Sequence, residues 1–233
     1  MQSEDRIIHF GVELIHPPVQ HKKETLQKLY FELSQVRNAG YDSTDFTVMA
    51  QPRFYSRRPP RSQSICLFLP DRVLVIEEWA DIAMSEFIDR VEAVASRVLA
   101  LEGVGQFIAH TATIRSTFAL TSVEDGRVFM LEHVCGHDPE MGRHFKRPLS
   151  MIGLRFHFPE TDEYPGNLQV SIEPFRQSPN EIYVEAKGVF TRERINPGHL
   201  DILTDHCRGV RTFIAERIFP YLNQFDVPKA PLE

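Results

Sequence analysis

A chain of 233 residues with 42% hydrophobic and 25% charged residues can bury a substantial core, and its composition excludes a disordered or fibrous protein. The net charge of −6 argues against a general nucleic-acid binder, which needs a basic surface. No apolar run has the length of a membrane span, "MQSEDRIIHF" lacks a signal-peptide pattern, and three scattered cysteines favour free thiols, so we expect a cytoplasmic protein.

The first hundred residues have the hydrophobic patterns of strands and two helices. Alternation of Phe10, Val12 and Leu14 is typical of a half-buried strand, whereas apolar spacings of three and four predict amphipathic helices. The predicted elements, in chain order, are a strand over 6–16, a helix over 22–35, strands over 46–56 and 64–79 (the second broken into a hairpin near Pro70), and a helix over 83–101.

The remainder of the chain has similar patterns. An Asp125-Gly126 pair, which is common in tight turns, predicts a hairpin between two strands. A long apolar stripe predicts a final amphipathic helix. The predicted elements are strands over 106–120, 127–134, 150–158, 168–175 and 181–190, followed by a helix over 198–225.

These elements predict an α+β fold of antiparallel sheets with long amphipathic helices. The similar strands "HFGVELIHPP" and "IGLRFHFPE", each followed later by a long helix, raise the hypothesis of an internal duplication of two similar halves. We expect a first α+β half over 1–148 and a second, smaller α+β half over 149–233 packed on it.

The stretch "EHVCGHDPEMGRH" concentrates groups that bind metals. If a strand continues through His133, Cys135 and His137, their side chains project from one face and could hold zinc with one position open, as in a metal-dependent hydrolase. Further candidates for such a site are the ligand His144 and, as a base or supporting group, Glu132 or Asp138.

The competing interpretation of this stretch is a polar loop without metal. Gly136 and the Asp138-Pro139 pair favour an end to the strand inside the motif, which would spoil the shared face. We favour the loop, and we therefore expect no cofactor, with zinc as the alternative.

Two other stretches offer weaker candidates. Arg53, Arg57, Arg58 and Arg61, interleaved with aromatic residues in an expected loop, could bind nucleic acid or phosphate. The acidic stretch "PETDEYPG" at 159–166 could offer oxygen ligands to a cation, although an acidic turn explains it more simply.

A cysteine nucleophile in the last helix is not expected. His206 and Cys207 are adjacent, and neighbouring residues of a helix do not face each other, so the imidazole could not activate the thiol.

The segment "VLVIEEWADIAMSEFIDRVEAVASRVLAL", a strand followed by Trp79 and a long helix, precedes the strand "ATIRSTF" with Arg115. In this arrangement the chain resembles a sporadically distributed family of uncharacterised bacterial proteins. The resemblance implies a bacterial cytoplasmic protein and carries no activity. We expect Trp79 to lie in the core and to pack the helix against the sheet.

The function that we favour from the sequence is a non-enzymatic binding or assembly protein that forms a homodimer with an unknown protein partner. The last helix is apolar enough to serve both a core and a partner, and we expect Phe213 and Tyr221 at the interface. The alternatives are the metal-dependent hydrolase and the nucleic-acid or phosphate binder described above.

Overall fold

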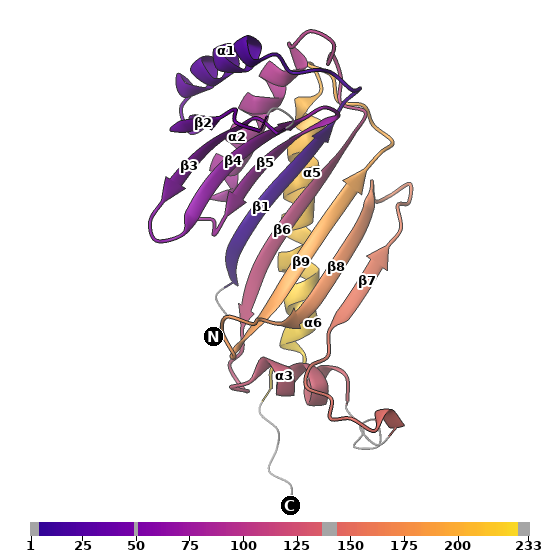
Figure 1. The fold of residues 1–233 in the computed structure, drawn as a ribbon. Coiled ribbons are helices and arrows are strands. Elements are labelled where there is room, and N and C mark those ends of the chain that lie inside the picture. Colours follow the sequence, from indigo (N-terminus) through magenta and orange to yellow (C-terminus); the bar gives the residue numbers. More distant parts are fainter. Residues whose placement is uncertain (1–4, 49–50, 137–143, 228–233) are drawn as a thin grey trace, which may run out of the picture.

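A computed structural model describes residues 5–48, 51–136 and 144–227. It has one large antiparallel sheet, with α2 and α5 against one face (Figure 1). The elements are β1 (Asp5–Ile15), α1 (Lys23–Ser34), β2 (Ser43–Asp45), β3 (Arg53–Arg58), β4 (Ser62–Leu69), β5 (Arg72–Glu78), α2 (Met84–Leu99), β6 (Ala109–Ala119), α3 (Gly126–Val128), the π-helical turn η1 (Phe129–Val134), β7 (Leu154–Phe158), β8 (Asn167–Pro174), β9 (Glu181–Phe190), α5 (Leu200–Phe213), the π-helical turn η2 (Ile214–Ile218) and α6 (Phe219–Asn223). The predicted α+β class is confirmed.

The nine strands lie in the order β2-β3-β4-β5-β1-β6-β9-β8-β7. Outward from the central β1–β6 pair, the order is β5, β4, β3 on one side and β9, β8, β7 on the other, and each side contributes a long helix. A duplication would give this arrangement, but the duplication itself stays a prediction. Because β6 pairs along its length with β9, the two halves divided at residue 148 share one sheet.

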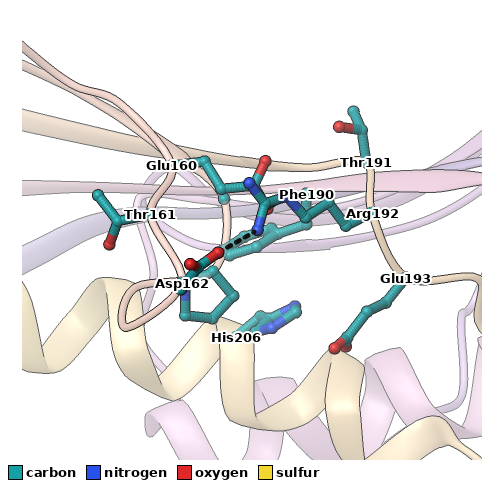
Figure 2. A pocket seen from close by; sticks show the side chains of 10 residues that line it. Glu160, Thr161, Asp162, Phe190, Thr191, Arg192, Glu193 and His206 are labelled. Atoms are coloured by element: carbon teal, nitrogen blue, oxygen red, sulfur yellow. Dashed lines mark hydrogen bonds and ion pairs between the residues drawn. The ribbon is translucent and has the colours of Figure 1, made fainter.

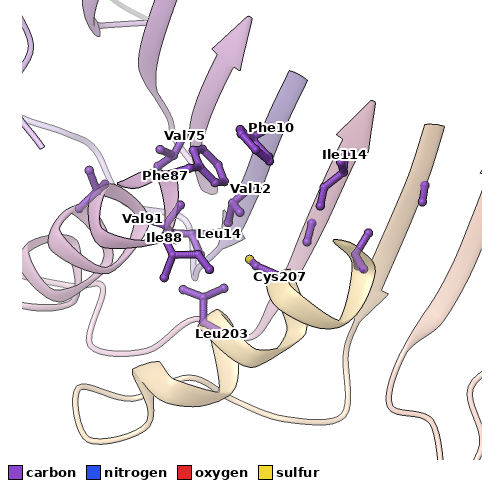
Figure 3. Close-up of a cluster of buried hydrophobic side chains, with 14 of the residues drawn as sticks. Phe10, Val12, Leu14, Val75, Phe87, Ile88, Val91, Ile114, Leu203 and Cys207 are labelled. Carbon is purple, nitrogen blue, oxygen red and sulfur yellow. The ribbon is translucent and has the colours of Figure 1, made fainter. Parts of the chain in front are cut away.

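Alternation along the strands places one set of side chains beneath the helices. Phe10, Val12 and Leu14 of β1 are almost fully buried, as their spacing predicted. Leu203 and Cys207 of α5 meet the side chains of α2 and β1 in this core (Figure 3). The core thereby fixes α5 to the sheet along one side of the helix.

The strand predicted over 127–134 is wrong. These residues form α3 and η1, and the Asp125 carboxylate accepts a hydrogen bond from the backbone N–H of Arg127 (2.8 Å) as an N-cap. An Asp-Gly pair serves equally in a hairpin turn and at the start of a helix, and the apolar residues Phe129 and Met130 are both buried, which breaks strand alternation.

Several predicted strands are shorter than expected. The strand predicted over 46–56 corresponds to β3, and that predicted over 150–158 corresponds to β7. The helix predicted over 198–225 is confirmed as the consecutive elements α5, η2 and α6. None of the helices in the described parts of the chain is long and apolar enough to cross a membrane.

The expectation that Trp79 lies in the core is wrong. Its side chain is half-buried, its backbone has a φ of 52°, and the guanidinium of Arg61 lies 4.2 Å from the ring centroid. Arg61 also donates to the side chain of Gln177 in the β8–β9 turn (3.0 Å). Trp79 therefore takes part in a contact with Arg61 at the end of the sheet rather than in the packing of α2.

Candidate functional site

A cavity of about 700 Å³ lies between α5 and the outer strands β8 and β9. Its size falls within the range of roughly 300 to 1,000 Å³ that is usual for small-molecule sites. Phe158, Phe190 and Phe213 line it together with the aliphatic residues Leu168 and Val210. The cavity is therefore mainly apolar and largely aromatic.

Of the three glycines that line this cavity, Gly188 and Gly209 differ most clearly in what surrounds them. A Cβ atom at Gly188 of β9 would lie 2.7 Å from the Phe190 ring and 2.9 Å from Val210 Cγ2, so close packing requires a glycine there. A Cβ at Gly209, inside α5, would meet nothing within 4 Å. Glycine in a helix interior costs about 1 kcal/mol relative to alanine, and no contact within the described chain accounts for this cost.

Phe190 forms the inner wall of the cavity and covers two histidines. Its ring stacks on His206 with a centroid distance of 4.0 Å and on His110 with 4.9 Å. His110 Nε2 and His206 Nδ1 are 3.0 Å apart and share a hydrogen bond between β6 and α5. No described residue hydrogen-bonds to His206 Nε2, which leaves that nitrogen without a protein partner in the described chain.

Burial keeps both imidazoles neutral at neutral pH. Desolvation, with a smaller effect of His206, lowers the pKa of His110 to about 3. Desolvation also lowers the pKa of His206, although the nearby carboxylates of Glu193, Asp205 and Glu160 oppose the shift. A neutral His206 offers the cavity a hydrogen-bonding group without a positive charge.

A second, smaller cavity of about 120 Å³ shares Phe190, His206 and Glu193 with the first and is lined by polar side chains (Figure 2). Arg192 carries the one guanidinium group of this lining, and its Nε and Nη1 atoms lie 3.0 Å and 3.5 Å from carboxylate oxygens of Glu160 and Asp162. The two cavities thus form a single site with an apolar body and an acidic mouth.

In the other half of the sheet, charged side chains occupy the comparable space between α2 and strands β3 to β5. Glu77 is fully buried and forms ion pairs with Arg90 and, at 2.9 Å, with Arg58. Arg58 is also paired with Asp81 (2.7 Å), and Ser64 donates to Glu77 (2.9 Å). Each charge of this network is therefore balanced by a partner within the chain.

The predicted zinc residues are not brought together as a strand would bring them. His133 and Cys135 lie in and at the end of the π-helical turn η1, where residues two apart do not face each other. His133 Nδ1 donates to the backbone O of Phe225 (3.2 Å), and burial raises the pKa of the Cys135 thiol. His137 lies outside the described residues.

Metal ligands do not gather elsewhere in the described chain either. Over 5–48, 51–136 and 144–227, no three His, Cys, Asp or Glu side chains lie close enough together to hold an ion. Cys207 is buried in the core, and burial raises the pKa of its thiol to about 12.

The arginines of the expected 53–61 loop lie mainly on a strand, which corrects that expectation. Arg53 pairs with Asp45 (2.8 Å), Arg58 joins the buried network, and Arg61 covers Trp79. Arg57 lies over the ring of Tyr55, 5.6 Å from its centroid. Three of the four guanidinium groups thus have partners within the chain, and Arg53 and Arg57 both lie over the Tyr55 ring. The nucleic-acid or phosphate binder stays a prediction.

The predicted interface residues pack against their own chain. Phe213 meets Phe158 edge to face (centroids 5.2 Å apart) and lines the cavity. Tyr221 contacts Phe156 and Phe225 in the same way, with centroids 6.1 Å and 5.2 Å apart. Both side chains remain half-buried, so neither is a freely exposed contact surface.

Sequence reasoning missed the cavity because its walls come from distant segments. His110 and His206 are separated by 96 positions, and no local motif relates them. A glycine in the middle of a strongly amphipathic helix was the one local signal, and Gly209 carries it. No family model, curated protein or solved structure matches this chain, so the resemblance to a bacterial family stays a prediction.

Proposed function

We propose that this protein is a non-enzymatic binding protein whose ligand is a small, mainly apolar molecule held between α5 and strands β8 and β9. Gly209 carries the proposal. A helix-interior glycine that faces empty space weakens the helix, and its benefit is the room that it leaves above the Phe190 and Phe213 rings.

The chemistry of the lining favours binding over catalysis. Catalysis by acid–base chemistry needs a titratable group poised near the working pH. Burial lowers the pKa of His110 to about 3, outside that range, and it also lowers the pKa of His206. Cys207 lies behind the wall with a raised pKa. Recognition of a ligand at this site would therefore depend mainly on the shape of the cavity and on its apolar surface area.

A fluorescent probe tests the proposal. N-phenyl-1-naphthylamine, a neutral aromatic compound, should fluoresce more strongly with the wild-type protein, and Gly209→Leu should abolish the increase because the new side chain fills the cavity. Gly198→Leu is the matched control, since a Cβ at Gly198 also meets nothing within 4 Å but lies outside the cavity lining. Absence of binding to wild type, or equal binding to Gly209→Leu, would overturn the proposal.

The homodimer, the unknown protein partner, the cytoplasmic location and the bacterial origin remain predictions. Native mass spectrometry of the purified protein tests the first of these. Phe213→Glu, which we expected to yield folded monomers, now also places a charge in the cavity lining, so its effect on probe binding must be measured together with its oligomeric state.

A further inference from the structure

We propose that the ligand is an amphipathic amine, with its apolar body in the larger cavity and its protonated nitrogen beside Glu193 and His206. This inference rests on the proposed function and specifies the class of ligand.

The charges at the mouth favour a cation. Carboxylates outnumber guanidinium groups among the lining residues by four to one, and the four are Glu160, Asp162, Glu193 and Asp205. Arg192 is already paired with Glu160 and Asp162, so it offers little to an anionic ligand. A carboxylate or phosphate in this position would meet uncompensated negative charge.

Glu193 is the carboxylate best placed to receive the cation. Asp205 is paired with Arg208 (2.8 Å), whereas no described residue forms an ion pair with Glu193. Figure 2 shows the Glu193 side chain extending toward α5, which is the helix that carries His206. In the tautomer in which His206 Nδ1–H donates to His110 Nε2, the lone pair of His206 is on Nε2. An ammonium group between Glu193 and this nitrogen would then donate one hydrogen bond to each of them.

The aromatic rim points to the same class of ligand. Tyr164 and Phe158 line the cavity with 65% and 39% of their surfaces exposed, which is unusual for large aromatic side chains. The faces of aromatic rings attract ammonium cations electrostatically. Exposed rings beside the Glu193 carboxylate thus give an amine two complementary sources of attraction.

Three probes with one body and different charges test the inference. The probes are 4-phenylbutylamine, 4-phenylbutan-1-ol and 4-phenylbutanoate, each titrated against the bound fluorescent naphthylamine at pH 7. The amine should bind about fivefold more tightly than the alcohol, the ratio expected of one solvent-exposed ion pair, and the carboxylate should bind most weakly. High salt should reduce the preference for the amine.

Variants locate the preference. Glu193→Gln should remove the advantage of the amine and leave the affinity for the alcohol unchanged. Glu163→Gln is the matched control, because Glu163 is an exposed acidic residue of the 159–166 segment that does not line either cavity. It should bind all three probes as wild type does.

The outcomes separate the two proposals. Equal binding of the three probes, or tighter binding of the carboxylate, would overturn the amine inference and leave the binding function in place. An amine preference that survives Glu193→Gln would also overturn it. If the naphthylamine itself does not bind to the wild-type protein, the proposed function fails.

Discussion

Replacing Gly209 by alanine should stabilise the protein. The new methyl group meets nothing within 4 Å, so it adds no strain, and alanine is favoured over glycine inside a helix by about 1 kcal/mol. For a chain of this length, a gain of that size raises the melting temperature by roughly 2 to 4 °C. Thermal unfolding followed by circular dichroism, together with urea titration, measures both quantities.

Replacing Gly188 by alanine should instead lower the free energy of unfolding. There the added Cβ would lie 2.7 Å from the Phe190 ring and 2.9 Å from Val210 Cγ2, and overpacking of this kind costs about 1 to 3 kcal/mol. Both variants add one methyl group beside the same cavity, so a difference between their stabilities reports the difference in local packing. A loss of stability in Gly209→Ala would refute the reasoning, because it would mean that the apo protein itself needs that glycine.

Three further predictions concern the rest of the molecule. Glu77→Leu should cost about 3 to 5 kcal/mol in urea unfolding because it leaves Arg90 buried and uncompensated, and the double variant with Arg90→Met should recover most of the loss; an additive double variant would contradict this pairing. The pKa of His110 is about 3 in the folded protein and near 6.5 in the unfolded chain, so the unfolded state binds more protons between these values. The free energy of unfolding should therefore fall by about 2 kcal/mol from pH 7 to pH 5. The His110→Leu variant should lack this part of the pH dependence. Native mass spectra before and after chelation should be identical, as a loop without metal requires, whereas a bound zinc ion that disappears in His133→Ala would revive the hydrolase hypothesis.

The error at residues 127–134 illustrates the limit of local patterns. Asp125 and Gly126 are compatible both with a hairpin and with a helix start, and short apolar runs fit either period. The choice depends on the surroundings of Gly126, where a Cβ would lie 3.1 Å from the backbone O of Glu181 in β9. That contact involves a segment more than 50 residues away, which no window of the sequence contains.

The sequence by itself determined the elements that have a long, regular hydrophobic period. Alternation in β1 and the apolar stripes of α2 and α5 are sufficient because burying one face of a strand or helix dictates its pattern over many residues. Tertiary structure alone decided the rest. Three features arise from pairings between distant segments: the strand order, the contact of His110 with His206, and the empty space beside Gly209. A cavity in particular depends on space that the surrounding side chains leave unfilled, and no local pattern in the sequence encodes that space.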